Sequence, residues 1–181
     1  MKKFNFFLLL TLLSTGIMTG QIKKTNLRKT VNSSNFEELV KWDKVAVFYS
    51  GFGEYVKFIP VYITDLKTGE KIKGFLVQMH VRSHKDGTIK IDKSAYISYE
   101  EAQDFASFLK KFVLPNLDKK VGTKEMLLYT YNASEISFTY KIKKNDRIII
   151  INFVHSNGAN EFWTRTQVKK IPKLVETLQS F

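Results

Sequence analysis

The sequence predicts an α+β domain in which antiparallel strand series are each followed by a helix. Several segments alternate between apolar and polar residues, which is the period of strands. Turns rich in Gly, Asp and Asn separate these segments, and helical stripes with start and stop signals follow them. Two architectures fit this order: two similar meander-and-helix units, or one larger sheet with helices packed on a face. With 181 residues, the chain has the usual length of one domain.

The first half begins with a short helix and continues as strands. Ser34 and Glu37 have the spacing of a capping box, which predicts a helix over 35–42. Pro60 indicates an edge position or a bulge in its strand. Strands are expected at 45–49, 55–64, 71–82 and a segment marked by Ile89, Ile91, Ala95 and Ile97. Within 71–82, alternation places four residues in the core: Phe75, Val77, Met79 and Val81.

The strongest helix signal follows this strand series. Ser98 is the expected N-cap, Glu101 closes a capping box, and Pro115 ends the helix. Its apolar stripe predicts a helix that covers a sheet, although such a stripe could also dock a partner. The helix completes the first of the two halves, 34–115.

The second half, 120–181, repeats the order of strands and helix. The segment 147–154 is almost continuously apolar, which predicts a central strand covered on both faces. Pro172 is the expected first residue of the last helix. Strands are expected at 126–131, 136–142, 147–154 and 161–168, and the residues expected in the core of the second are Ile136, Phe138, Tyr140 and Ile142.

Residues 1–20 are predicted to be a signal peptide. Lys2 and Lys3 precede a short apolar run, 4–13, and a small polar segment, 14–20. The run is too short for a comfortable membrane span, and no other segment approaches that length. The Lys-rich start and the Gly20–Gln21 junction resemble exported proteins of Bacteroidota-type bacteria. We therefore expect a periplasmic or secreted protein, with an uncleaved N-terminal anchor as the alternative.

The composition gives a basic chain without cysteine. Lack of cysteine excludes disulfides, thiolate metal ligands and a cysteine nucleophile. Removing residues 1–20 with their two lysines lowers the net charge from +12 to +10. Residues 21–33 are polar and basic, and we expect a flexible arm there. Such a charge suits an anionic partner, and electrostatic attachment through this arm is one candidate function.

No motif predicts catalysis, a metal or a cofactor. His80 and His84 would share a strand face with Arg82 between them, which disfavours a metal. The motifs of zinc proteases, serine hydrolases and phosphate-binding loops are absent. Carboxylates near Ser98 and in the turns have helix-capping or turn roles instead of forming a glycosidase pair. We therefore expect no catalytic residue, metal or cofactor, and keep an enzyme of unrecognised class as the alternative.

Strand aromatics beside many lysines raise the question of nucleic-acid binding. The sequence has no RNA-recognition motif, and an exported protein seldom meets nucleic acid. We do not expect nucleic acid as a partner, because strand aromatics usually belong to a core. The aromatic residues in question are Tyr129, Tyr131, Tyr140, Phe153 and Trp163.

Asn157–Gly158 predicts a two-residue β-turn. That turn would place Phe153 opposite Phe162 and Asn152 opposite Trp163. Alternation then puts Phe153, Phe162 and His155 on one strand face. The opposite face would carry the candidate binding residues Trp163, Glu161, Arg165 and Asn152.

The sequence favours a non-catalytic exported module that binds an envelope component, a glycan or another protein. Trp163 among polar neighbours is the candidate patch, since an aromatic platform ringed by polar groups suits sugars or peptides. The alternative role of Trp163 is packing under a helix.

Overall fold

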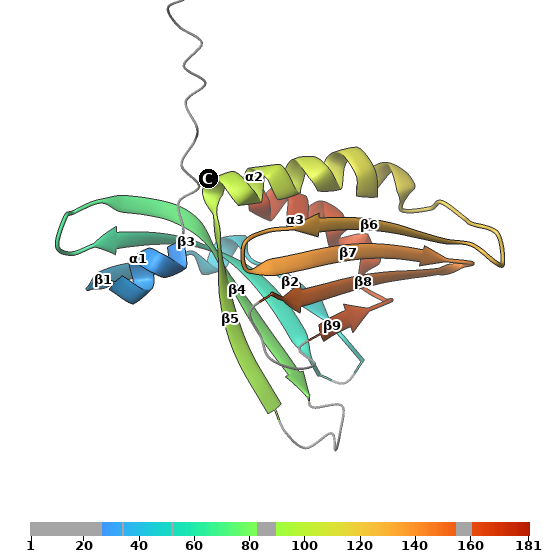
Figure 1. Ribbon diagram of the computed structural model, residues 1–181, viewed down its shortest axis with the longest axis horizontal. Helices are drawn as coiled ribbons and strands as arrows, with labels where there is room; N and C mark the ends of the chain where they lie inside the picture. The colour runs from blue at the N-terminus through green and yellow to red at the C-terminus, as the bar shows by residue number, and fades with distance from the viewer. Residues whose placement is uncertain (1–26, 34, 52, 83–89, 155–160) are drawn as a thin grey trace, which may run out of the picture.

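The described part of the chain forms two antiparallel sheets and three α-helices, a mixed α+β architecture with more strand than helix (Figure 1). The computed structural model describes residues 27–33, 35–51, 53–82, 90–154 and 161–181. The expected signal peptide, residues 21–26 and the Asp86–Gly87 and Asn157–Gly158 turns lie outside these described residues. Within the described residues, none of the helices has the length and apolar character needed to cross a membrane.

The first sheet contains five strands and is centred on β3. Its order is β1-β3-β4-β5, and β2 also pairs with β3. The strands are β1 (Phe36–Val40), β2 (Ala46–Tyr49), β3 (Tyr55–Asp65), β4 (Lys71–Arg82) and β5 (Lys90–Ser98). The expected core residues of β4 are all buried: Phe75, Val77, Met79 and Val81.

Pro60 lies in β3, which pairs with β4 on one side and with β1 and β2 on the other. β3 is therefore not an edge strand, and the expectation of an edge position or a bulge is wrong for this strand as a whole. β1 and β2 pair with successive parts of one side of β3, ending at Val61 and beginning at Phe58. The Pro60 carbonyl accepts the Lys41 N–H at 3.0 Å on that side. Because the nitrogen and oxygen of a strand residue point the same way, the proline nitrogen faces the gap between β1 and β2. No ladder hydrogen bond is required there.

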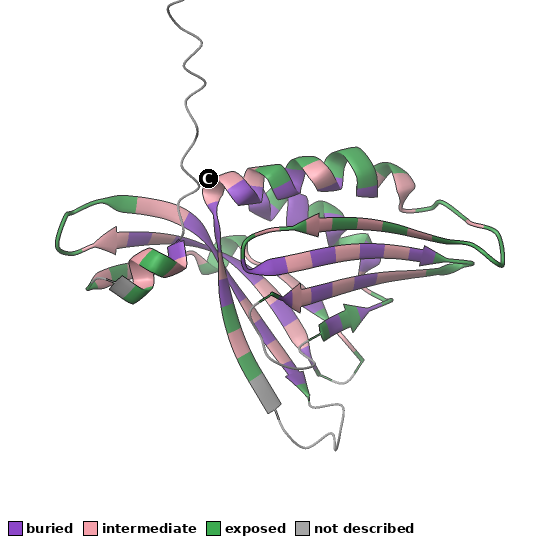
Figure 2. Cartoon of the chain, viewed as in Figure 1, coloured by how far each residue is buried: buried purple, intermediate pink, exposed green. Residues whose placement is uncertain are grey.

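The second sheet is a four-stranded meander with the order β6-β7-β8-β9. Its strands are β6 (Met126–Asn132), β7 (Ile136–Lys143), β8 (Asp146–Phe153) and β9 (Glu161–Thr164). Buried residues alternate with half-buried or exposed ones along β7 and β8 (Figure 2). The expectation that 147–154 is covered on both faces is therefore wrong, because Ile148 and Ile150 lie on the more open face. The strand expected at 161–168 ends at Thr164.

Helix α2 (Tyr99–Phe108) begins as expected, with Ser98 and Glu101 forming a complete capping box. It continues through a π-helical turn (Leu109–Val113) and a 3-10 turn (Leu114–Asn116). Helix α3 (Ile171–Leu178) follows a 3-10 turn (Val168–Lys170), with Pro172 at its second position instead of its first. α3 contacts β2 and β3 of the first sheet as well as α2. The expectation of two separate meander-and-helix units is therefore not confirmed.

One hydrophobic core joins both sheets to α2 and α3. Phe105 of α2 lies near its centre, with ring centroids 6.2 Å from Phe58 and 5.1 Å from Phe138. Its ring also stacks on Tyr131 at 4.7 Å. Since these partners come from β3, β7 and β6, loss of the Phe105 ring would weaken contacts across the whole domain.

A second, smaller core lies on the other face of the first sheet. Helix α1 (Leu27–Ser33) covers it, with Leu27 buried against Gly74 of β4. A Cβ on Gly74 would meet the Leu27 side chain and would lie 2.6 Å from the Ile97 carbonyl oxygen. The glycine therefore permits the close approach of α1 to the sheet. Residues 27–33 of the expected flexible arm are thus helical and anchored.

The helix expected at 35–42 is wrong, because Phe36–Val40 forms strand β1. Its burial alternates, and Phe36 and Val40 pack on the smaller core. Leu39, which would complete a helical stripe, is 56% exposed. The edge of β3 supplies hydrogen-bond partners for the whole of 36–40. These strand hydrogen bonds outweigh the local preference for a helix that the Ser34–Glu37 spacing indicates.

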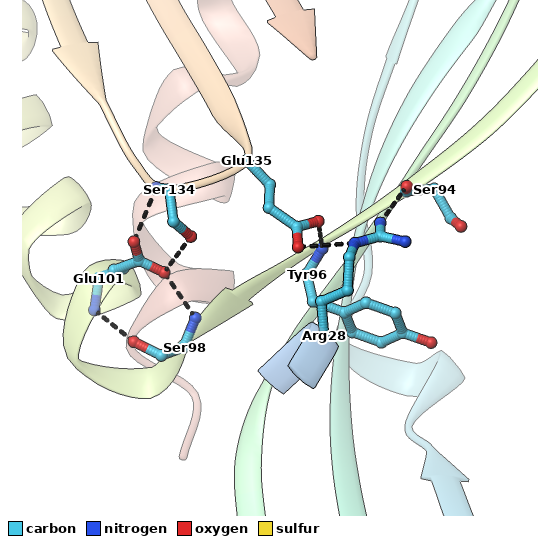
Figure 3. Close-up of polar contacts among 7 residues, drawn as sticks. All are labelled: Arg28, Ser94, Tyr96, Ser98, Glu101, Ser134 and Glu135. Atoms are coloured by element: carbon cyan, nitrogen blue, oxygen red, sulfur yellow. Dashed lines mark hydrogen bonds and ion pairs between the residues drawn. The ribbon is translucent and has the colours of Figure 1, made fainter. Parts of the chain in front are cut away.

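Two buried glutamates tie the halves of the chain together at the edge of β5 (Figure 3). Glu135 accepts the Tyr96 N–H at 2.8 Å and forms a 2.6 Å ion pair with Arg28. Glu101 accepts the Ser98 N–H at 3.0 Å and the Ser134 N–H at 2.7 Å. These carboxylates satisfy backbone groups on the side of β5 that faces away from β4, its one partner among the described strands.

Candidate functional site

The second sheet has one face in the core and an outer face that is more open. Polar side chains gather in one row across the outer face, in pairing register: Asn132, Ser137, Asn152 and Glu161. The neighbouring row contains Thr130, Thr139, Ile150 and Trp163. The outer face is defined by these two rows, Met126, Leu128, Lys141, Lys143, Asp146 and Ile148, and by Arg165 just beyond β9.

Trp163 lies on this outer face and is 38% exposed. The alternative that it packs under a helix is therefore wrong. Its partner across the sheet is Ile150, and Asn152 pairs with Glu161. The expected pairing of Asn152 with Trp163 is wrong by two residues, because Asn152 pairs with Glu161 and Trp163 pairs with Ile150.

A shift of two residues preserves which face each side chain takes. Phe153 and Phe162 are buried, as expected. The four candidate residues Trp163, Glu161, Arg165 and Asn152 all belong to the outer face. His155, expected on the core side, lies outside the described residues.

Arg165 connects Trp163 to a neighbouring pocket. Its guanidinium carbon lies 5.6 Å from the centroid of the Trp163 ring, within the range of a cation–π contact. Its Nη1 lies 3.9 Å from Asp146 Oδ2, and both side chains are more than half exposed. So long and exposed an ion pair contributes little to stability, which leaves Arg165 available for another anion.

The pocket has a volume of about 490 Å³ and lies beside the start of β8. Three basic side chains line it, Arg147, Arg165 and Lys169, together with two acidic ones, Asp118 and Asp146. Leu117, Asn145, Thr166 and Val168 complete the lining. A pocket with both kinds of charge can hold a ligand that carries an anionic group and hydrogen-bond donors.

Backbone carbonyls hold Arg147 in the wall of this pocket. Its Nη1 donates to the Asn145 carbonyl at 3.3 Å and its Nη2 to the Lys119 carbonyl at 3.2 Å. The nearby Tyr140 hydroxyl donates to the Leu117 carbonyl at 3.2 Å. Burial raises the pKa of Tyr140, while the positive charge of Arg147 opposes that rise. The wall therefore keeps a fixed positive charge beside a neutral phenol.

The histidine that sequence reasoning considered for a metal lies elsewhere, on the first sheet. His80 Nδ1 lies 2.6 Å from Asp92 Oδ1, and its ring stacks on Tyr55 at 5.2 Å. Among the residues that the structure describes, no cluster of three His, Asp or Glu side chains could hold a metal ion. His84 lies outside the described residues.

Sequence reasoning identified Arg165 and missed the pocket beside it. The other charged residues of the pocket, Asp118, Asp146, Arg147 and Lys169, come from three separate segments. Strand alternation relates side chains within one sheet, but it cannot relate the segment after α2 to the segment after β9. The basic stretch 141–147 was the one local signal, since it contains Arg147.

The chain matches no family model, and neither a curated protein nor a solved structure resembles it significantly.

Proposed function

We propose that the chain is an exported, non-catalytic module that binds a saccharide of the cell envelope on the outer face of its second sheet. The observation that carries the proposal is the exposed Trp163 in contact with Arg165, which also lines a pocket. An indole ring offers a flat apolar surface for the C–H face of a sugar ring, and nearby polar groups fix its orientation. The expected leader supports export.

The neighbours of Trp163 favour a saccharide over a protein as the partner. Hydroxyl and amide groups from three strands share its part of the face, including Thr139 and Asn152. Such groups can pair with sugar hydroxyls, as donors or as acceptors. The exposed apolar side chain of Leu128 lies across from Lys141, which interrupts the contiguous apolar area that a protein interface centre needs.

Two tryptophan variants test this proposal. Trp163→Ala should abolish retention of the purified protein on immobilised amylose, xylan, chitin, pectin or dextran sulfate, whichever retains the parent. A central aromatic contact is worth about 2 kcal/mol or more, roughly a thirtyfold loss of affinity. Trp42 is 62% exposed on another part of the chain, so Trp42→Ala is the matched control and should keep retention.

The proposal fails if none of these polysaccharides retains the parent protein, or if both tryptophan variants lose retention equally. It also fails if Trp163→Ala unfolds the domain by circular dichroism, because Trp163 would then act in stability.

A further inference from the structure

We infer that the pocket beside Trp163 is an anion subsite, and that the ligand is an acidic saccharide whose carboxylate or sulfate binds Arg165. This inference rests on the proposed function, since Trp163 would hold the sugar ring to which the anionic group is attached. Arg165 belongs to both features: its guanidinium lies against the indole and lines the pocket. A ring and its charged substituent can therefore be bound at adjacent positions.

The net charge of the pocket lining favours binding of an anionic group over a cationic one. Its lining contains three cationic and two acidic side chains, so the balance is positive by one. Arg147 is already held by two carbonyls, whereas Arg165 and Lys169 are exposed. An arginine can bind a carboxylate or sulfate through two parallel hydrogen bonds, which gives geometric selectivity beyond charge.

Asp146 is an internal competitor for Arg165. Its carboxylate lies 3.9 Å from the guanidinium, farther than a direct hydrogen bond. An incoming anion that makes closer contact with Arg165 would replace this pair at little cost, because both side chains are solvated. Asp146, once released, repels a second negative charge. The site should thus favour one isolated anionic group over a dense series.

This mixture of charges favours an acidic saccharide over nucleic acid. A polynucleotide places a negative charge on every unit, and Asp118, Asp146 and Glu161 would oppose it. Trp163 is also the only aromatic residue among those that define the outer face, whereas single-stranded nucleic acid is usually bound on several stacked aromatic side chains. The hydroxyl and amide rows suit the neutral hydroxyls of a sugar.

Matched pairs of probes separate charge from sugar recognition. The full-length mature protein is titrated calorimetrically with 4-O-methylglucuronosyl-xylobiose, which carries one carboxylate, and its methyl ester, and with lactose 6′-sulfate and lactose. In the first pair, esterification removes the charge of the carboxylate. In the second pair, the neutral sugar lacks the sulfate group. We expect at least one acidic probe to bind about tenfold more tightly than its neutral partner, which corresponds to one charge-assisted contact.

Substitutions of Arg165 and of Asp146 should change the affinity for the acidic probe in opposite directions. Arg165→Gln should lower affinity for the acidic probe to that of its neutral partner, and Arg165→Lys should give an intermediate value. Asp146→Asn should raise affinity about 1.5- to 5-fold, because it removes a weak competing pair. Lys67→Gln and Asp43→Asn are the matched controls, since each changes one exposed charge on the first half of the chain. Both controls should leave affinity unchanged.

Three outcomes overturn the inference. If neutral and acidic probes bind equally and through Trp163, the saccharide module stands and the anion subsite fails. If no probe binds, both proposals fail. If single-stranded poly(dT) binds more tightly than every saccharide and depends on Arg165, the site is a polyanion site instead.

Discussion

The Glu135 carboxylate accepts a hydrogen bond at 2.8 Å from the backbone N–H of Tyr96, on an edge of β5 that pairs with none of the strands the structure describes. The next N–H on this side, that of Ser98, donates to Glu101 at 3.0 Å. Arg28 binds Glu135 and donates to the Ser94 carbonyl at 2.7 Å (Figure 3). Side chains from α1, α2 and the β6–β7 turn thus replace a neighbouring strand and fix the second sheet against the first.

Glu135→Ala should lower the free energy of unfolding by about 2–4 kcal/mol, because it leaves the part-buried Tyr96 N–H and the Arg28 guanidinium without their carboxylate partner. Arg28 is partly exposed, so solvation of its guanidinium reduces the contribution of the Arg28–Glu135 ion pair to the loss of stability. Urea unfolding measures the change. Glu135→Gln keeps an acceptor and should lose less, and Glu70→Ala, at an exposed turn, is the control. Equal losses for Glu135→Ala and Glu70→Ala would contradict the bridging role.

Gly74→Ala should destabilise the protein by about 1–3 kcal/mol, as over-packing does. The new methyl group would meet Leu27 and the Ile97 carbonyl oxygen. Thermal unfolding measures the loss. In a Leu27→Ala background the side-chain clash disappears but the 2.6 Å approach to the carbonyl remains. The glycine substitution should therefore still destabilise that background, and complete rescue would show that only the Leu27 side chain matters.

Alkaline pH should destabilise the domain through half-buried tyrosines. Burial raises the pKa of Tyr131 and of Tyr96 above the ordinary value of 10.0. The folded protein keeps these phenols protonated while the unfolded chain begins to lose their protons. Stability is therefore fully present below pH 10 and falls as pH rises towards the folded-state pKa values. Urea midpoints measured from pH 8 upwards should decline above pH 10.

Tyr131→Phe separates the titration from the hydrogen bond. The Tyr131 hydroxyl donates to the Glu101 carbonyl at 2.7 Å, so the variant should lose about 1 kcal/mol at neutral pH. Its decline above pH 10 should be shallower than that of the parent protein, because one titrating group is missing. An identical alkaline slope in both proteins would exclude Tyr131 as a source of the pH dependence.

Sequence patterns predicted the elements whose local and tertiary preferences agree. Alternation identified the buried face of β7, where Phe138 and Tyr140 lie in the core, and the Ser98–Glu101 capping box identified the start of α2. The segment 36–40 failed because its apolar residues fit a helix and a strand equally well. The partner edge of β3, distant in sequence, decided between them.

Strand alternation predicted one part of the candidate site, the residues of the outer face, but not the pocket. Alternation along β9 separates Trp163 and Arg165 from Phe162 whatever the register, and a register shift of two residues keeps Asn152 on the face of Trp163. The pocket required the position of Asp118, which follows α2, relative to Arg165, which follows β9. Only the packed tertiary structure brings those segments together.

Fluorescence of Trp163 in a Trp42→Phe protein tests the binding role of the outer face most directly. The chain has two tryptophans, so this variant reports on Trp163 alone. We predict that 4-O-methylglucuronosyl-xylobiose or lactose 6′-sulfate will shift or quench its emission in a saturable way, and that Arg165→Gln will weaken the response. An emission that stays constant with both probes and their neutral partners, in a folded protein, would contradict the role of this face in saccharide binding.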